Sequence, residues 1–268
     1  MEKILFICGV PRSGTTYAQR LIVNNFMCMT GQESSVIDGY LSPLVARIKS
    51  DKSEERGNLG LSAYFKKDEL DNILKEMMVN ILNKMSLSLN TFYKNKPSLM
   101  VEKTPSNVLF VDDIIKYIDN SKILIIERDT NDILKSLIRA RSAWGNDWVP
   151  KKTRHLLKLI ELHKHSIEKA RNIKSDKIMM YSFNKMKDDN ETFIREVSYF
   201  LDEQMLCISG SNENNLSTKK TNIPVMIEDK WELHEENNDF IFNNRKLSLL
   251  EKLEILIISS LLHWKGFK

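Results

Sequence analysis

The chain has 268 residues, of which 42% are hydrophobic and 28% are charged, with a formal net charge of +4. This is the composition of an ordinary globular protein, long enough for one large domain or two small ones with a substantial core. The charge suits an anionic ligand but is too small to predict a nucleic-acid partner.

The ends of the chain and its cysteines bear on the compartment. The first apolar strand begins at Lys3, which leaves no room for a signal peptide. The late apolar segment 247–264 contains three charged residues, so we expect an amphipathic packing helix and no stable membrane insertion. Three scattered cysteines indicate buried thiols more than a metal site or a disulfide: Cys8, Cys28 and Cys207. We therefore expect a soluble, cytoplasmic protein.

The first elements of the chain surround a glycine-bounded loop. Residues 3–8 (KILFIC) predict a strand, residues 17–26 predict a helix, and residues 9–16 (GVPRSGTT) connect them. A strand, such a loop and a helix are typical of a phosphate-binding loop, where backbone N–H groups and the positive helix end surround an anion. The spacing Gly-x4-Gly-x-Thr is that of the P-loop, but Thr15 stands at the lysine position.

The missing lysine argues against a nucleoside triphosphate. In P-loop enzymes the lysine reaches the β- and γ-phosphates, and the next Ser or Thr ligates magnesium. The acidic residue best placed to hold that metal is Asp129, and it directly follows Arg128. The loop therefore favours a nucleotide with fewer phosphates, bound without a metal. A glycine turn without a ligand is the alternative, although packing alone poorly explains two glycines, two threonines and an arginine at one junction.

The rest of the chain alternates apolar strands with amphipathic helices. Strands are predicted at 98–101, 122–126 and 177–181, and helices at 68–89, 107–118, 132–141, 152–171, 191–201 and from 247. Ser106 is expected to cap the helix 107–118, and Thr130 or Asn131 the next one. The pattern predicts an α/β, three-layer, P-loop-like fold with a central parallel sheet flanked by helices. No repeat or linker is visible, so residues 1–268 are expected to form one domain.

Ligands of such sheets bind at the carboxyl ends of the strands. Besides the loop, these ends carry Lys103, Arg128 and Tyr181, and Ser136 follows Arg128 by eight residues. A guanidinium and a hydroxyl at this edge could hold a phosphate separate from the one in the loop.

Together the two motifs resemble those of sulfotransferases that use 3′-phosphoadenosine 5′-phosphosulfate (PAPS). In that family a loop similar to Pro-Arg-Ser-Gly-Thr-Thr holds the 5′-phosphosulfate, and an Arg and a Ser eight residues apart hold the 3′-phosphate. The resemblance assigns the first role to Arg12, Ser13, Gly14, Thr15 and Thr16, and the second to Arg128 and Ser136.

The resemblance extends to further positions that are less specific. Arg139 or Arg141 is a second candidate for the 3′-phosphate. Tyr181 resembles a tyrosine that contacts the cofactor in relatives, or is a strand-end aromatic. Lys230 resembles the cation of a loop that closes over the cofactor in tyrosylprotein enzymes, or belongs to a solvated basic loop.

Sulfonyl transfer needs cations and N–H groups around the sulfonate, and a base for the acceptor proton. Arg12 and Lys103 are the expected stabilising cations. Cytosolic relatives place a histidine base two residues after that lysine, where this chain has Pro105. Glu33 lies 21 residues after Arg12 (33 minus 12), where tyrosylprotein and related bacterial enzymes place a glutamate base. Glu102 is the rival, although neighbours along a strand point to opposite sides.

The resemblance thus implies transfer of the sulfonate of PAPS to a hydroxyl of a carbohydrate or small-molecule acceptor, with PAP as product and no metal required. A P-loop kinase-like phosphotransferase is the alternative, and a non-catalytic nucleotide-binding protein is a third reading. Residues 36–70 and 144–148 are expected on the acceptor side, and residues 50–60 could form a lid. A homodimer is compatible with the sequence.

Overall fold

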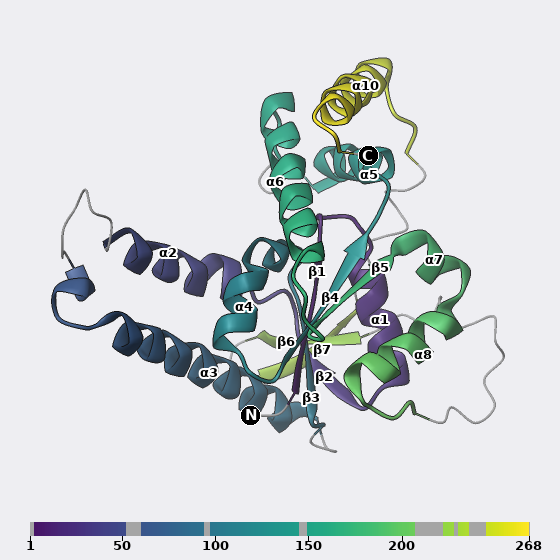
Figure 1. Cartoon of the computed structure of the whole chain (residues 1–268). Helices are drawn as coiled ribbons and strands as arrows, with labels where there is room; N and C mark the ends of the chain where they lie inside the picture. Colours follow the sequence, from purple (N-terminus) through teal and green to yellow (C-terminus); the bar gives the residue numbers. More distant parts are fainter. Residues whose placement is uncertain are drawn as a thin grey trace.

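The computed structural model describes residues 3–51, 60–93, 97–144, 149–206, 222–227, 230–235 and 245–267. Its centre is a sheet of five parallel strands in the order β2–β3–β1–β4–β5 (Figure 1). The strands are β1 (Lys3–Gly9), β2 (Cys28–Thr30), β3 (Leu99–Lys103), β4 (Ser121–Glu127) and β5 (Ile178–Ser182). The α/β fold with a central parallel sheet, expected from the alternation of strands and helices, is confirmed.

Helices cover both faces of the sheet (Figure 1). One face carries α1 (Thr15–Asn25), α7 (Phe183–Asp188) and α8 (Asn190–Leu201); the other carries α3 (Lys67–Phe92), α4 (Val111–Tyr117), α5 (Thr130–Trp144) and α6 (Thr153–Arg171). Alternate residues of β1 serve the two cores, since Phe6 packs with α3 to α6 and Ile7 with α1 and α8. Burial on both faces explains why this strand is apolar at nearly every position.

The structure contains short elements that periodicity did not predict. A π-helix, η1 (Val36–Leu41), leads into α2 (Ser42–Asp51), and a 3-10 turn, η2 (Gly60–Ala63), precedes α3. A separate antiparallel hairpin joins β6 (Asn222–Ile227) and β7 (Lys230–Glu235). Most of the expected lid at 50–60 falls on residues 52–59, which lie outside the described residues. Cys207 and Trp148 also lie outside them.

Two predicted helix starts are wrong. The segment 107–118 is not one helix, because a 3-10 helix, η3 (Pro105–Phe110), precedes α4. Ser106 therefore caps nothing, and its hydroxyl donates to Asp38 instead. At the start of α5 the capping acceptor is Asp129, whose Oδ1 accepts from the backbone N–H of Asp132 at 3.1 Å. The Asp129 carboxylate, which was the nearest candidate for a magnesium ligand, thus serves as a helix cap.

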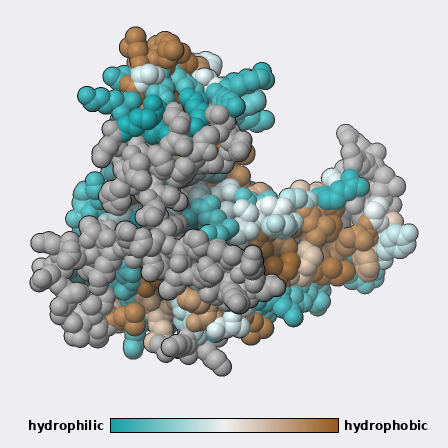
Figure 2. Space-filling view, turned by 180° about the vertical axis from the view of Figure 1, so that it is seen from behind, coloured by the Kyte–Doolittle hydropathy of each residue, from teal (hydrophilic) through white to brown (hydrophobic). Residues whose placement is uncertain are grey.

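The last helix, α10 (Leu249–Trp264), packs against α5 and α6 through Ile255, Ile258 and Leu262. It is apolar on its outer side as well, so the expected amphipathic pattern is wrong there. Figure 2 shows apolar residues gathered at the top of the molecule, over α10. The large exposed apolar residues of this helix are Leu249, Leu250, Leu253, Leu256, Ile257, Leu261 and Trp264. Among the described helices, none combines the length and the apolar character that crossing a bilayer requires.

A partly buried ion pair fixes α10 to the body of the protein. Arg141 of α5 donates to both carboxylate oxygens of Glu254, at 3.1 and 2.6 Å, and both side chains are about one-seventh exposed. The Thr153 hydroxyl at the start of α6 donates to the same carboxylate. The pKa of the Arg141 guanidinium is raised, first by its hydrogen bonds to Glu254. The Glu254 carboxylate of α10 therefore binds α5 through a bidentate contact and α6 through a single hydrogen bond.

We expect Glu254→Ala to lower the free energy of unfolding by about 3 kcal/mol, because the Arg141 charge would stay partly buried without its partner. Urea denaturation followed by circular dichroism measures the change. The matched control is Lys252→Ala, an exposed position on the same helix, which should change stability by less than about 0.5 kcal/mol. Equal effects of the two substitutions would show that the ion pair does not stabilise this junction.

Candidate active site

The connections of the sheet create a crevice at the carboxyl end of β1. From β1 the chain runs to β2 and β3 on one side, and then crosses to β4 on the other. Ligands of parallel sheets bind where the strand order reverses in this way. Residues 9–16 follow β1 directly, Lys103 is the last residue of β3, and Arg128 follows β4. The predicted site residues therefore meet at one edge of the sheet.

The loop requires glycine at both ends. A Cβ at Gly9 would lie 2.5 Å from the carbonyl oxygen of Ile126 and 2.7 Å from Ser13 Oγ. Gly14 has a φ of +105°, and a Cβ there would lie 2.2 Å from a ring carbon of Phe183. Helix α1 begins at Thr15 after Gly14, which has no side chain to cap the first turn. The N–H groups of that turn are thus directed at the crevice, as in anion-binding helix ends.

The structure brings the two predicted phosphate-binding motifs into contact. Arg12, which has a positive φ of 74°, donates from Nε to Ser136 Oγ at 3.0 Å. Arg128 donates from Nη1 to the backbone oxygen of Arg12 at 3.2 Å. Its guanidinium also lies over the ring of Phe183, 4.4 Å from the centroid. Phe183 was missed by the sequence reasoning, although it lies only two residues beyond Tyr181 at a strand end.

The charges and donors of this loop suit an anion. Burial lowers the pKa of the Arg128 guanidinium, and the nearby Arg12 charge adds to the effect. Arg128 Nε and Ser13 Oγ are buried without a hydrogen-bond partner in the part of the chain that the structure describes. Since buried polar groups are normally satisfied, these two unpartnered donors beside two close cations indicate a site that is completed by an anionic ligand.

Lys103 and Glu33 form an ion pair beside the loop. The Lys103 side chain is 4% exposed, and its Nζ lies 2.5 Å from Oε1 of Glu33, whose side chain is 48% exposed. Lys103 points to the α1 side of the sheet, because its strand partner Ile7 does so. A buried ammonium needs a compensating anion, and Glu33 supplies it from the segment after β2.

Glu102, the rival base, is buried on the opposite side of β3. Its Oε1 accepts from Ser34 Oγ at 2.8 Å and Thr104 Oγ1 at 2.7 Å, and its Oε2 accepts from Asn107 Nδ2. Burial raises the pKa of this carboxyl, and the hydrogen bonds from Thr104 and Ser34 offset part of the rise. Glu102 thus ties the segment that carries Glu33 to the strand that carries Lys103.

The remaining candidate residues are described by the contacts that they make. Tyr181 is buried and packs edge-on against Phe193 at 4.9 Å, and burial raises the pKa of its hydroxyl to about 12. This placement agrees with a strand-end aromatic in the core. Arg139 donates to the backbone oxygen of Arg245, and Arg141 is held by Glu254. Lys230 begins β7, and its side chain lies outside the described part of the structure.

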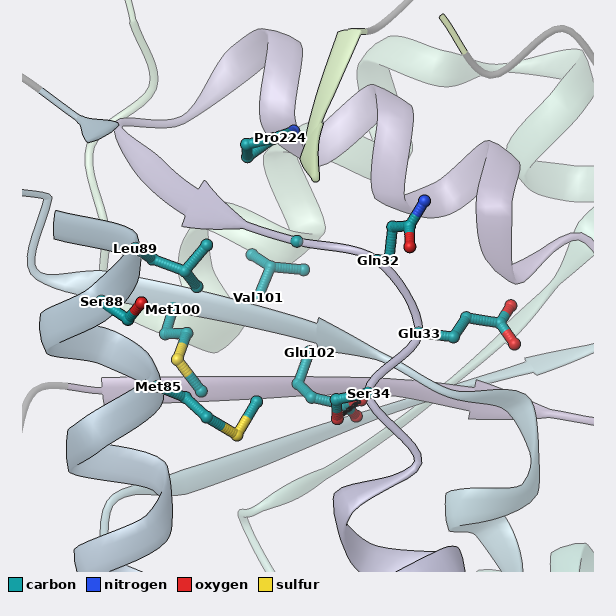
Figure 3. Close-up of a pocket in the computed structure, with 11 residues that line it drawn as sticks. Gln32, Glu33, Ser34, Met85, Ser88, Leu89, Met100, Val101, Glu102 and Pro224 are labelled. Carbon is teal, nitrogen blue, oxygen red and sulfur yellow. Dashed lines mark hydrogen bonds between the residues drawn. The ribbon is translucent and has the colours of Figure 1, made fainter. Parts of the chain in front are cut away.

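A cavity of about 360 Å³ adjoins the Glu33 segment (Figure 3). Its walls come from residues 31–34, from the last turns of α3, from β3 and from β6. The lining residues are Gly31, Gln32, Glu33, Ser34, Met85, Ser88, Leu89, Met100, Val101, Glu102 and Pro224. None belongs to residues 36–70, the expected acceptor side, and Tyr40 and Tyr64 of that range are largely exposed. Sequence spacing could not have joined these four segments.

The hydrogen bonds of Glu102 predict different results for two substitutions. Glu102→Gln should stay within about 1 kcal/mol of wild-type stability, because Asn107 can turn its amide and offer Oδ1, which has no partner among the described residues. Glu102→Ala should cost about 3 kcal/mol, since three donors lose their acceptor. Urea denaturation at pH 7 measures both.

The pH dependence provides a second check on Glu102. Because the folded pKa of this carboxyl is raised, the folded state binds the extra proton, and the resulting stability is lost as pH rises through the folded value. Glu102→Gln lacks that titration. The stability of wild type relative to Glu102→Gln should therefore fall with rising pH. A difference that stays constant with pH would contradict the role given to burial.

The comparisons with known proteins identify the family of the chain. The model of the sulfotransferase family matches residues 5–205. A protein-tyrosine sulfotransferase of Drosophila melanogaster is 25% identical over 205 residues, which cover 74% of this chain and 38% of the relative. The chain thus spans well under half the length of that relative.

Solved structures show the same fold. The sulfotransferase domain from the curacin biosynthetic pathway matches with a TM-score of 0.50 and 14% identity, over 100% of this chain and 99% of that one. A mouse sulfotransferase in complex with PAP matches at 12% identity over 81% of this chain and 62% of that chain. Its TM-score is 0.38, which carries no structural argument. With a family match over most of its length, the chain belongs to the sulfotransferase family, the PAPS-dependent enzymes that its two motifs resemble.

Proposed function

We propose that this protein transfers the sulfonate of PAPS to a hydroxyl of a carbohydrate or small-molecule acceptor, with Glu33 as general base. The observation that carries the proposal is the ion pair between Glu33 and the buried Lys103, beside the loop that holds Arg12. A cation, a carboxylate and an anion-binding loop at one strand edge are the groups that this reaction needs.

The residues around the crevice suit both ends of the donor. The loop amides, Ser13 and Thr15 would hold the 5′-phosphosulfate at the start of α1. Arg128 and Ser136 would hold the 3′-phosphate, and the unpartnered Arg128 Nε is the donor available for it. Arg12 lies between the two groups, because it contacts Ser136 through its side chain and Arg128 through its backbone. No metal ligand is needed in this scheme.

When bound, PAPS would supply a sulfonate attached to a phosphate leaving group. The acceptor oxygen would form a bond to sulfur while the bond between sulfur and the bridging oxygen breaks. The electron pair of the broken bond would leave with PAP. Lys103 and Arg12 stabilise the negative charge that develops there. Glu33 accepts the proton of the acceptor hydroxyl on its carboxylate.

The ion pair also regulates when the base is available. As long as Glu33 pairs with Lys103, its Oε1 is engaged and does not face an acceptor hydroxyl. Lys103 can exchange this partner for an anionic oxygen held in the neighbouring loop. Glu33 is half-exposed, so it can turn toward an acceptor once that oxygen has taken its place beside the buried Lys103 charge.

The nucleotide preference separates this proposal from a kinase-like phosphotransferase. We expect PAP to bind more tightly than ATP by at least tenfold, with or without magnesium, because Thr15 replaces the lysine that would reach a γ-phosphate. Isothermal titration calorimetry measures both ligands. Arg128→Met should weaken PAP more than adenosine 5′-phosphate, which lacks the 3′-phosphate. Tight binding of ATP with magnesium and no binding of PAP would refute the proposal.

The role of Glu33 is tested by removing its charge. Glu33→Gln should lower kcat for sulfonate transfer about 100-fold or more, while PAP affinity stays within about twofold. Transfer of radiolabelled sulfonate from PAPS to an acceptor panel measures the rate. The matched control is Glu76→Gln, which removes a carboxylate at an exposed position of α3 outside the cavity lining and should retain activity. Near-normal turnover in Glu33→Gln would exclude it as the base.

A further inference from the structure

We propose that the cavity beside residues 31–34 binds the acceptor, and that the acceptor is an alcohol carried on an apolar aliphatic body. This inference rests on the proposed function, since it uses Glu33 as the base. It narrows the acceptor from any hydroxyl compound to a lipophilic one, and it disfavours a free sugar.

The inner wall of the cavity is apolar. Its hydrocarbon and thioether surface comes from Met85, Leu89, Met100, Val101 and Pro224. In Figure 3, Met85 of α3 and Met100 of β3 extend into the same space from two different elements. Methionine side chains are flexible and polarisable, and they adapt to aliphatic ligands of different shapes.

Of the five polar side chains in the lining, all but that of Ser88 are engaged or point elsewhere. Ser34 donates to Glu102, which accepts two further hydrogen bonds from Thr104 and Asn107. Figure 3 shows Gln32 and Glu33 directed away from Met85 and Met100. A sugar ring in this space would bury more hydroxyls than the Ser88 hydroxyl can pair with, which is strongly unfavourable. An aliphatic body has no such requirement.

The cavity reaches the reacting groups through the Glu33 segment. Glu102 lines it on the face of β3 opposite to Lys103, and the segment spans both sides, because Ser34 donates to Glu102 while Glu33 pairs with Lys103. Glu33 belongs to its wall and carries its carboxylate to the side where Lys103 lies. An alcohol with its apolar body among the methionines can therefore place its hydroxyl at the rim formed by residues 32–33. There its oxygen would attack sulfur, and its proton would pass to Glu33.

The size of the cavity supports a single apolar group. A volume of about 360 Å³ lies at the lower end of the range for small-molecule sites, about 300–1,000 Å³. Leu89, Met100 and Val101 are nearly inaccessible to solvent although they line it. A space with a buried apolar floor and an open rim favours an apolar group on its floor, with a polar group at the rim.

A series of linear primary alcohols from ethanol to 1-octanol tests the proposal, with methyl glucoside as the polar comparison. The value of kcat/KM should rise about fourfold for each added methylene until the cavity is full. Methyl glucoside should react no faster than ethanol. A flat series, or faster sulfonation of methyl glucoside than of 1-octanol, would overturn the proposal.

A binding measurement without turnover provides an independent readout. Calorimetric titration of PAP-loaded protein with 1-octanol should give saturable binding. Met85→Phe should fill part of the cavity and weaken this binding at least tenfold, with PAP affinity unchanged. The matched control is Met77→Phe, since Met77 lies two turns earlier on α3, is also a half-buried methionine and does not line the cavity.

The outcomes separate the two proposals. Loss of 1-octanol binding in Met85→Phe, and its retention in Met77→Phe, would support the acceptor site. Equal behaviour of the two variants would overturn it, as would unchanged binding in Met85→Phe. If PAP itself fails to bind wild-type protein, the proposed sulfotransferase function fails. If PAP binds and only sugars are sulfonated, the lipophilic acceptor alone fails.

Discussion

The end of β3 places two charged side chains in the interior, and the need to compensate them organises the site. Because strand residues alternate, Glu102 and Lys103 point to opposite faces of the sheet, and both are about 4% exposed. Neither charge could stay there alone. Glu102 is satisfied by three donors from neighbouring segments, and Lys103 by Glu33. Glu33 and Ser34 are neighbours in the chain, so the contact to Lys103 and the contact to Glu102 both hold the segment that follows β2.

The donor side depends on a different constraint, the close approach of backbones. Gly9 lies against the carbonyl of Ile126, and Gly14 lies against Phe183, so the loop can turn back between β1 and α1. This turn carries Arg12 to Ser136 and allows Arg128 to support its backbone. A cluster of cations and N–H groups is thus built from rigid strand and helix ends. Such a fixed cluster stabilises negative charge on a ligand without having to rearrange when the ligand binds.

The cavity that we propose for the acceptor has the opposite character. It is bounded by four segments from different parts of the chain, two of which contribute methionines. A polar, rigid donor site next to an adaptable apolar cavity is a reasonable division for a transferase, because one substrate is constant and the other can differ between relatives. The outer face of α10 is a second exposed apolar surface, and it lies away from this site (Figures 1 and 2).

The amino-acid sequence alone determined the layered sheet, the order of its main elements and the set of residues that meet at the carboxyl edge of the sheet. These follow from local features: apolar runs of strand length, helical periodicity, and a loop whose glycines and threonines are contiguous. The elements that were not predicted are short or irregular: η1, α2, α7 and the hairpin. The cap of α5 is Asp129 and neither Thr130 nor Asn131, a choice that depends on side-chain geometry. Only the tertiary structure paired Glu33 with Lys103 and Arg141 with Glu254, enclosed Glu102 among three donors, and assembled the cavity. Each of these depends on contacts between residues far apart in the chain, and such contacts leave no periodic signal in the sequence.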